Sequence, residues 1–346
     1  MTTISNALKK AQLIQEGIIY VPPDISQKLI FNKSSAGPHT YNPCITLQWD
    51  SHRVKLEVTK ESTSLFSLHH YKNGYCIQKN QTPYLEDITI VPNLFHAPDQ
   101  IFLNIEDRCI YNCGFCSLAK SIQPKHHLPL TTEHCIDLIN KILEEKQFSS
   151  VALTSGVYPT NKEIIASMCA IIQRIKEKHP LISFGVEPCI FTYEEMQALK
   201  NAGADEIKIN IQLPDENIFS KICPDFQYTK TLTLLEEAVA LFGKGNVTSN
   251  IIYGMGETDA SIEETLNYLS KMGVVPTLRK IRINNHNKKE LEQRLHQELP
   301  PTTAERMIQL AKKQKVILKK YNLTTKTFHT MCHACGCCDI VPFCDI

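Results

Sequence analysis

The sequence lacks several features that would point to particular classes of protein. It has no apolar run long enough to cross a bilayer, which excludes a membrane-spanning protein. Its 37 basic and 36 acidic residues give a formal net charge of +1, so the chain lacks the excess of positive charge that is typical of nucleic-acid-binding proteins. The first residues carry no secretory signal pattern. These absences predict a cytoplasmic protein that binds neither membranes nor nucleic acid.

Recognisable hydrolytic machinery is also missing, since no Ser/His/Asp arrangement stands out. Cysteine, by contrast, is abundant, with 14 in 346 residues. Because the cytosol keeps thiols reduced, this number suggests metal or redox chemistry. A hydrophobic content of 42% supplies enough apolar material for a sizeable folded core.

Three cysteines are crowded into one short segment, at Cys109, Cys113 and Cys116. This segment directly follows an apolar stretch, residues 101–105, that is typical of a strand. Three thiolates within eight residues suit an iron–sulfur cube, because its irons prefer sulfur ligands. A [4Fe-4S] cube has four irons, so three cysteines would leave one iron open to a ligand that is not protein.

Two other interpretations of this segment are open. A structural zinc site needs four protein ligands, commonly as two separated pairs, whereas this segment has three cysteines and no nearby histidine. Disulfide bonding fits poorly with an odd number of cysteines in a chain without a secretory signal. Both alternatives fit the pattern less well than a cluster does.

The C-x3-C-x2-C spacing, with the aromatic Phe115 just before the last cysteine, resembles the signature of the radical S-adenosylmethionine (radical SAM) superfamily. The resemblance implies that Cys109, Cys113 and Cys116 bind a catalytic cluster and that SAM chelates its open iron. It also implies that the reduced cluster cleaves SAM to a 5′-deoxyadenosyl radical. Phe115 is then a candidate to pack against adenine and to shield the cluster from water.

From residue 101 onward, predicted strands and helices alternate regularly. Six strand–helix units predict an α/β fold with a parallel sheet wrapped by helices. The resemblance makes this a partial (βα)6 radical SAM barrel, a choice that the periodicity alone leaves open. Strands are expected at 101–105, 149–154, 182–187, 206–211, 247–252 and 279–283. Helices are expected at 132–146, 161–178, 192–202, 228–242 and 260–272.

The predicted division of the chain follows from this alternation. Residues 1–98 show period-two strands in a hairpin arrangement and predict a small N-terminal α+β extension. Residues 99–285 hold the barrel. Residues 286–346 hold a helix at 303–320 and then a cysteine-rich C-terminal tail.

Ligands of such barrels bind at the carboxyl ends of the strands, so polar residues and glycines there are candidate contacts for SAM. The segment at 154–156 resembles the family's short glycine-containing segment that hydrogen-bonds the SAM amino group. The G-x-G-E-T segment at 254–258 looks like the one that meets adenine in the biotin synthase branch. Ordinary βα turns and strand-end side chains are the alternative at each place. The candidate cofactor-binding residues are Phe115, Thr154, Ser155, Gly156, Glu187, Asn210, Gln212, Gly254, Gly256 and Glu257.

The tail holds a second cysteine group. Its five candidate metal ligands are Cys332, Cys335, Cys337, Cys338 and Cys344. A C-x2-C-x2-C-x5-C spacing within them suits an auxiliary [4Fe-4S] cluster, while a zinc site that also uses His329 or His333 is the alternative. The sequence does not decide which four of the five bind metal. We expect the tail to fold back over the carboxyl ends of the strands. The remaining cysteines are interpreted as small buried apolar residues, at positions 44, 76, 135, 169, 189 and 223.

The resemblance reaches the biotin synthase/lipoyl synthase-like branch, in which an auxiliary cluster can donate sulfur. It implies a lipoyl synthase-like sulfurtransferase that inserts sulfur at an unactivated C–H bond. Ordinary lipoyl synthases carry their extra cysteines N-terminally, so a two-component archaeal-type enzyme is an alternative. Others are a cofactor-maturation enzyme that catalyses rearrangement or dehydrogenation with an electron-relay cluster, and a non-catalytic iron–sulfur carrier. Expected partners are a ferredoxin- or flavodoxin-type electron donor, and a lipoyl-carrier protein or second radical SAM subunit.

Overall fold

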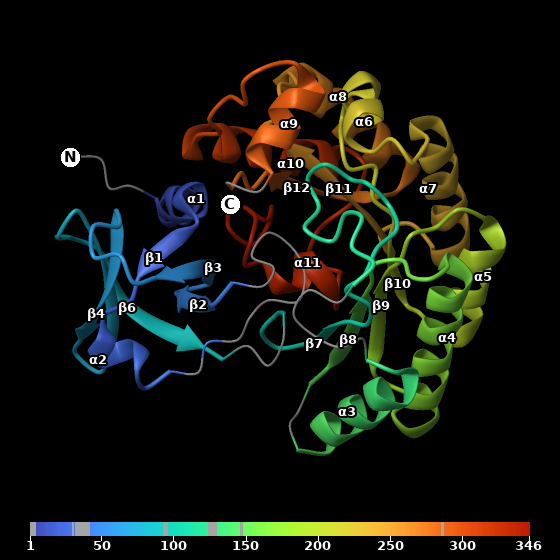
Figure 1. Ribbon diagram of the computed structural model, residues 1–346, viewed down its shortest axis with the longest axis horizontal. Coiled ribbons are helices and arrows are strands. Elements are labelled where there is room, and N and C mark those ends of the chain that lie inside the picture. Colours follow the sequence, from blue (N-terminus) through green and yellow to red (C-terminus); the bar gives the residue numbers. More distant parts are fainter. Residues whose placement is uncertain are drawn as a thin grey trace.

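The computed structural model describes most of the chain in two folded regions that share the C-terminal tail between them (Figure 1). One region is a small β-barrel near the N-terminus, and the other is a parallel α/β sheet with helices on its outer side. The described residues are 5–29, 31, 42–92, 96–123, 130–145, 148–284 and 287–346.

The N-terminal region is a closed barrel of six strands. Its elements are α1 (Asn6–Glu16), β1 (Ile18–Tyr20), α2 (Pro23–Ser26), β2 (Cys44–Trp49), β3 (His52–Thr59), β4 (Phe66–Tyr71), β5 (Gly74–Lys79) and β6 (Thr82–Val91). The strand order is β1-β3-β2-β6-β5-β4, and β1 also pairs with β4 to close the ring. Strands β2 and β3 are antiparallel neighbours, which confirms the predicted hairpin. The sequence did not predict the closure of the barrel.

Alternation of side chains explains this small barrel. Leu47, Leu56, Phe66 and Ile77 come from four different strands and are buried in one cluster. Side chains two apart on a strand point to the same face, so each strand gives one row of apolar groups to the barrel interior. Each fully buried side chain of this size contributes about 1.5–3 kcal/mol relative to exposure.

The second region is a sheet of six parallel strands in which each strand pairs with its neighbour in the sequence. The strands are β7 (Ile101–Asn104), β8 (Ser150–Thr154), β9 (Ser183–Glu187), β10 (Glu206–Lys208), β11 (Val247–Tyr253) and β12 (Val275–Lys280). The helices between them are α3 (Thr132–Glu145), α4 (Asn161–Lys178), α5 (Tyr193–Ala202), α6 (Glu216–Ile222), α7 (Tyr228–Phe242) and α8 (Asp259–Met272). The predicted alternation of strands and helices is confirmed.

Helix ends are specified locally. Thr192 and Glu195 form a reciprocal capping box at the start of α5. Gly203 and Gly273 end α5 and α8 in the left-handed conformation that glycine adopts most readily. These signals place the helices close to their predicted bounds.

The sixth strand differs from its prediction. It runs over Val275–Lys280 and not over 279–283. Pro276 lies inside it and pairs with Ser249 of β11. A proline is tolerated there because β12 is an edge strand of the described sheet, where a missing N–H costs no ladder bond. Because proline is rare within strands, the sequence pattern did not predict that this strand begins at Val275.

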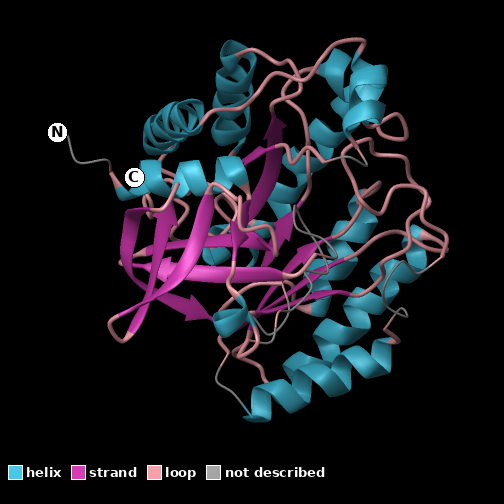
Figure 2. Ribbon diagram, turned by 60° about the vertical axis from the view of Figure 1, so that its left-hand side comes forward, coloured by secondary structure: helices cyan, strands magenta, loops and turns pink. Residues whose placement is uncertain are grey.

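Three more helices follow the sheet, α9 (Lys288–Leu295), α10 (Ala304–Lys320) and the short α11 (Met331–Cys335). Helix α11 lies inside the curve of the sheet (Figure 1), while the long helices lie around the outside of the strands (Figure 2). Its Met331 packs with Phe102 of β7, while the ring of its His333 lies 3.2 Å from the Val275 oxygen of β12. A five-residue helix can touch both edge strands only if the sheet curves around it. The sheet is thus a partial barrel, open between β7 and β12.

The position of the tail differs from the prediction. The tail enters from the amino ends of the strands, where Glu206 at the start of β10 accepts hydrogen bonds from the backbone N–H groups of His329 (2.7 Å) and Thr330 (3.1 Å). Gly185 makes room for it, because a Cβ atom there would lie 1.9 Å from the Thr330 hydroxyl oxygen. The tail therefore fills the concave side of the sheet and does not cover the carboxyl ends.

A buried ion pair fastens the end of the tail to the N-terminal region. Lys10 of α1 is 1% exposed and donates to Asp345 Oδ2 and to the Gly336 carbonyl, each at 2.6 Å. The ring Nδ1 of His52 lies 2.9 Å from Asp345 Oδ1. We call Lys10, His52 and Asp345 the tail clasp.

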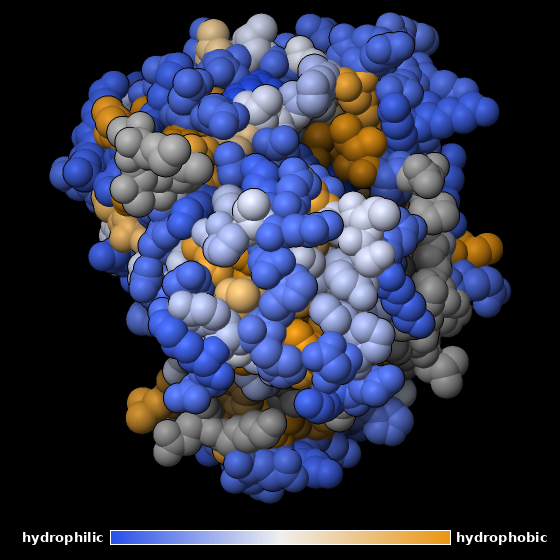
Figure 3. All heavy atoms as spheres, turned by 90° about the vertical axis from the view of Figure 1, so that its left-hand side faces the viewer, coloured by the Kyte–Doolittle hydropathy of each residue, from blue (hydrophilic) through white to orange (hydrophobic). Residues whose placement is uncertain are grey.

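None of the described helices has the length and apolar character needed to span a bilayer. The face over the N-terminal barrel is largely hydrophilic, with apolar side chains in small separate groups (Figure 3). The division of the chain at residues 98 and 285 stays a prediction.

Candidate functional site

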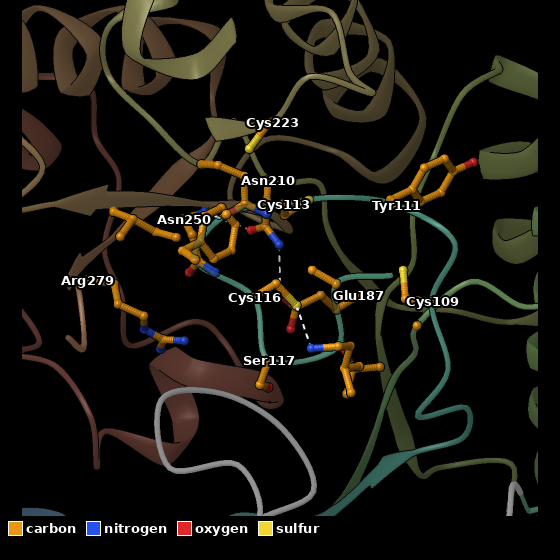
Figure 4. Close-up of a pocket in the computed structure, with 18 of the residues that line it drawn as sticks. Cys109, Tyr111, Cys113, Cys116, Ser117, Glu187, Asn210, Cys223, Asn250 and Arg279 are labelled. Carbon is orange, nitrogen blue, oxygen red and sulfur yellow. Dashed lines mark hydrogen bonds between the residues drawn. The ribbon is translucent and has the colours of Figure 1, made fainter. Parts of the chain in front are cut away.

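A cavity of about 1000 Å³ lies at the carboxyl ends of the parallel strands (Figure 4). Loops that follow strands β7 to β12 supply most of its wall. Asn42 and Glu57, from the N-terminal region, complete one side. The cavity is thus where the barrel geometry places ligands.

Cys109, Cys113 and Cys116 all line this cavity. They lie on the irregular loop after β7, and all three are half-buried. Backbone hydrogen bonds hold the loop, since the Cys116 N–H donates to the Cys113 carbonyl at 3.0 Å and the Ile110 N–H donates at 3.0 Å to the carbonyl of Val157, on the loop after β8. The structure therefore brings the three predicted cluster ligands to one cavity.

Burial favours the protonated form of Cys109 and Cys113 in the absence of metal. The loss of solvent raises the pKa of Cys109. The pKa of Cys113 is raised through its hydrogen bond with Cys223 and through burial. Thiolate ligands must be deprotonated, so metal binding here would release protons. Within the described residues, no three His, Cys, Asp or Glu side chains gather closely enough to hold a single metal ion.

Two cysteines that the sequence did not single out also line the cavity. Cys223 caps the end of α6, is 1% exposed and packs with Cys113 and Phe115. Cys189 lies two residues beyond the end of β9, and burial raises its pKa. Their interpretation as buried apolar residues holds for Cys223. The position of Cys189 just after a strand end was the one signal in the sequence that could have placed it here.

Thr154, Ser155 and Gly156 lie on the cavity wall after β8, as predicted. The Gly156 N–H donates to the Glu106 carbonyl at 2.7 Å. A Cβ atom at Gly156 would lie 2.1 Å from the Arg108 carbonyl oxygen, so only glycine fits against the cysteine-bearing loop. This glycine therefore lets the loops after β7 and β8 pack closely together.

Glu187, Asn210 and Gln212 also line the cavity. The Asn210 amide donates to Glu187 Oε1 at 2.8 Å, and its oxygen accepts from the Asn250 N–H at 2.9 Å. Asn250, 5% exposed, is a further polar group on the wall that the sequence did not single out. Its position beside Thr248 and Ser249, at the polar middle of the predicted strand, was its only signal.

Phe115 lines the cavity and packs in the apolar cluster that includes Leu213 and Met255. This position fits the predicted role of facing a ligand, and it also makes Phe115 part of the apolar core. Whether it contacts adenine stays a prediction.

Gly254, Gly256 and Glu257 are not among the described residues that line the cavity. Glu257 folds back and accepts hydrogen bonds from the backbone N–H groups of Gly254 and Met255, each at 2.8 Å. Arg306 of α10 also donates to it at 2.9 Å. The two glycines have positive φ angles of 104° and 105°. This segment is therefore a tight, internally bonded turn, and its role in binding SAM stays a prediction.

The five tail cysteines are spread over different surroundings. Cys332 lines the cavity, whereas Cys335 and Cys337 are buried in the apolar cluster with Phe102. Cys338 is half-buried, and Cys344 is exposed. Hydrogen bonding with Cys337 lowers the pKa of Cys335 to about 6, whereas burial raises the pKa of Cys338 to about 12. Which of them bind metal stays a prediction.

Two cations hold Cys332 at the floor of the cavity. Lys208 Nζ and Arg279 Nη2 each lie 3.3 Å from the Cys332 sulfur. Lys208 is fully buried and also lies 3.2 Å from Glu187 Oε1, while Arg279 is paired with Asp339 at 2.7 Å. Burial alone would lower the pKa of Lys208, but the Cys332 sulfur and the Glu187 carboxylate outweigh it and raise that pKa. Arg279 lies across the cavity from Cys109 (Figure 4).

These groups fit the cofactors that the sequence predicts. Three thiols on one loop are suitable ligands for a [4Fe-4S] cluster with one open iron. The amide oxygens of Gln212 and Asn250 are buried, line the cavity and have no hydrogen-bond donor among the described residues. Buried acceptors of this kind need donors, and the amine and ribose hydroxyls of SAM could supply them.

The chain has similar sequences among proteins of known function. The chain is similar to the biotin synthase of Streptococcus agalactiae serotype V, with 30% identity over 162 residues, which is 44% of this chain and 46% of the relative. It is also similar to the lipoyl synthase of Micrococcus luteus, with 30% identity over 189 residues, covering 53% of this chain and 54% of the relative. The chain thus spans about half the length of these curated relatives.

Solved structures share the fold. The FeFe-hydrogenase maturase HydG from Carboxydothermus hydrogenoformans superposes with a TM-score of 0.52 at 15% identity, over 64% of this chain and 52% of its own. Methylornithine synthase (PylB) superposes with a TM-score of 0.51 at 17% identity, over 62% of each chain. Residues 103–269, which carry the three cysteines, strands β8 to β11 and the end of β7, match the family described as the Radical SAM superfamily. Residues 103–269 therefore form a radical SAM domain, and the similarity of the chain to biotin synthase and lipoyl synthase places this domain near their branch.

Proposed function

We propose that Cys109, Cys113 and Cys116 bind a [4Fe-4S] cluster in the cavity and that SAM occupies the remaining space beside it. The observation that carries this proposal is that all three thiols share one cavity with the polar groups at the strand ends. When bound, the reduced cluster supplies the electron that cleaves SAM to a 5′-deoxyadenosyl radical and methionine.

The protein's own residues bind and orient SAM in this proposal. The Gln212 and Asn250 amide oxygens accept hydrogen bonds from its hydroxyl or amine groups. Glu187 is already oriented by Asn210, so its carboxylate is fixed before the ligand arrives. Phe115 offers an apolar surface for adenine and excludes water from the cysteine loop.

We further propose that the radical is used to insert sulfur at an unactivated C–H bond, as in lipoyl-type cofactor assembly. Similarity to biotin synthase and lipoyl synthase supports this proposal. The tail supports it too, because Cys332 reaches the cavity and could present an auxiliary cluster to the substrate. A ferredoxin- or flavodoxin-type electron donor, and a lipoyl-carrier protein or second radical SAM subunit, would be its partners.

One observation favours a second candidate function. Cys335 and Cys337 lie in the apolar cluster beneath the cavity and not on its wall, and the Cys337 carbonyl accepts from the Lys55 N–H of the N-terminal region at 3.0 Å. A cluster held mainly by these cysteines would be set back from the substrate. It would then pass electrons, as in a cofactor-maturation enzyme that catalyses rearrangement or dehydrogenation.

Electron paramagnetic resonance (EPR) tests the proposed cluster site. Anaerobically reconstituted and reduced protein should give a [4Fe-4S] signal that changes when SAM is added. The triple variant with alanine at positions 109, 113 and 116 should lose the SAM-sensitive signal and keep any signal from the tail. A SAM-sensitive signal in the triple variant would contradict the proposal.

Acid-labile sulfide tests the proposed sulfur insertion. The protein is mixed with SAM, a reductant and a peptide that carries a saturated acyl chain on lysine. Sulfur insertion from an auxiliary cluster should lower protein-bound sulfide in step with the sulfur that appears in the peptide. If 5′-deoxyadenosine accumulates while sulfide stays constant, the electron-relay function is favoured.

A further inference from the structure

The cysteine loop is held by residues distant in the sequence, at Asn112. The Asn112 N–H donates to Asp225 Oδ2 at 2.6 Å. Its carbonyl oxygen accepts from Arg294 Nη1 at 3.0 Å, and its side-chain oxygen accepts from Arg294 Nη2 at 2.8 Å. These hydrogen bonds therefore fix both the main chain and the side chain of Asn112, the residue just before Cys113. We call Arg294 and Asp225 the loop clamp.

The contact continues to the next residues of the loop. The Gly114 N–H donates to the Ile222 carbonyl at 2.8 Å, at the end of α6. A Cβ atom at Gly114 would lie 3.2 Å from Arg294 Cδ, so the loop backbone lies directly against the stem of this arginine. The clamp therefore holds both sides of Cys113.

Arginine is suited to binding two oxygens of Asn112 at once, because a guanidinium has several hydrogen-bond donors in a rigid plane. Arg294 lies in the last turn of α9, and its side chain is 17% exposed. Glu290, one turn earlier, pairs with it and also lines the cavity. The arginine thus links the cavity wall to the backbone of the cysteine loop.

Helix α9 does not depend on Arg294 for its packing. Leu291 and Leu295 are buried in the apolar cluster that contains Phe219 and Ile222 of α6. These contacts anchor the helix, whereas the guanidinium of Arg294 is directed to the loop. Removing the guanidinium should consequently leave the fold in place.

We propose that Arg294 is a positioning residue for the cluster, which fixes Cys113 toward the cavity through Asn112. The inference rests on the proposed function for its role in SAM cleavage, but the clamp itself can be tested without a cluster. Groups around metal ligands typically change metal affinity or activity by about 10–100-fold when they are removed.

The first test uses the cluster-free protein. In Arg294→Ala, Cys113 should react with iodoacetamide several times faster than in wild type, as measured by mass spectrometry of its peptide. Arg174→Ala is the matched control, since Arg174 lies on α4 and pairs with Glu133 at 3.6 Å, away from the loop. In Arg174→Ala, the rate at which iodoacetamide labels Cys113 should equal the rate in wild type. Wild-type labelling in Arg294→Ala would overturn the proposal.

The second test uses the reconstituted protein. Arg294→Ala should lose iron to a chelator about tenfold faster than wild type, and its EPR signal should respond less uniformly to SAM. Arg294→Lys, which keeps the charge but not the planar fork, should recover only part of the difference. Leu291→Ala should lower stability while leaving the iron-release rate near that of wild type. If Leu291→Ala reproduces both effects fully, Arg294 is merely structural and the proposal fails.

The two tests separate the possible failures. A wild-type protein that binds no SAM-sensitive cluster would refute the proposed function, and the labelling experiment would still decide whether the clamp exists. A wild-type protein that cleaves SAM, paired with an Arg294→Ala variant that behaves like it in both tests, would refute the clamp alone.

Discussion

Replacing Asp345 with alanine should unfasten the tail clasp and destabilise the protein strongly. Asp345 accepts from Lys10 Nζ at 2.6 Å and from the Val341 N–H at 2.7 Å, and it lies 2.9 Å from the His52 ring. Its side chain is 2% exposed and that of Lys10 is 1% exposed. The substitution would leave the Lys10 charge buried with the Gly336 carbonyl as its remaining acceptor among the described residues.

Breaking a buried ion pair on one side costs about 3–5 kcal/mol, because the remaining charge stays desolvated. Total unfolding free energies are about 5–15 kcal/mol, so this loss is a large fraction. Replacing both partners together, as Lys10→Met with Asp345→Leu, should recover most of it, since an apolar pair of similar volume avoids the desolvation penalty. The matched control is Glu263→Gln, which removes an exposed ion pair with Lys313 and should change little.

The clasp should also depend on pH. Burial alone would raise the pKa of Asp345, but Lys10 and the hydrogen bonds from His52 and Val341 outweigh it, and the pKa is lowered. A lowered carboxyl pKa stabilises the fold above the unfolded value, about 3.9, and this contribution disappears as the pH falls through the folded value. Urea unfolding of wild type and Asp345→Asn at pH 7 and below pH 4 should show a difference that shrinks in acid. Equal stabilities at pH 7 would refute the reasoning.

Three further predictions concern the cluster loop and the tail. Cys223→Ala should make the midpoint potential of the loop cluster more negative by about 40 mV, because the Cys223 thiol packs beside Cys113 and would donate a hydrogen bond of about 1 kcal/mol to its cluster-bound sulfur. An unchanged potential in a redox titration would contradict this. Gly185→Ala should destabilise the folded protein by about 1–3 kcal/mol, because its Cβ would meet Thr330, and Thr330→Ala should recover part of the loss in denaturant unfolding. Wild-type stability of Gly185→Ala would contradict the packing of the tail. Removing all five tail cysteines should lower bound iron by about four atoms while SAM cleavage survives. Metal analysis that finds zinc and the iron of a single cluster in wild type would contradict the auxiliary cluster.

Local signals explain why much of the sheet could be predicted from the sequence. The capping box of Thr192 and the left-handed Gly203 set the bounds of α5 from residues within it or beside it. The three-cysteine loop is equally local, and its place after a strand brought it to the carboxyl end of the barrel. The strand-end residues Thr154 and Asn210 lie on the cavity wall for the same reason.

Contacts between distant residues explain what the sequence did not reveal. Arg294 meets Asn112 across 182 positions, and Lys208 meets Cys332 across 124. The tail can pack on the concave side of the sheet because Gly185 has no side chain there. A contact of this kind leaves no periodic pattern in the sequence. The G-x-G-E-T motif predicted a turn, but it did not predict which way the turn faces. Its Glu257 accepts hydrogen bonds from its own segment and from Arg306.

The central claim is that Cys109, Cys113 and Cys116 hold the cluster that cleaves SAM. The most direct measurement is 5′-deoxyadenosine formed from SAM by the reduced, anaerobically reconstituted protein, with the triple alanine variant at these positions in parallel. We predict that wild type produces 5′-deoxyadenosine and that the triple variant does not, although it keeps its fold and its tail. Equal production by the two proteins would contradict the claim.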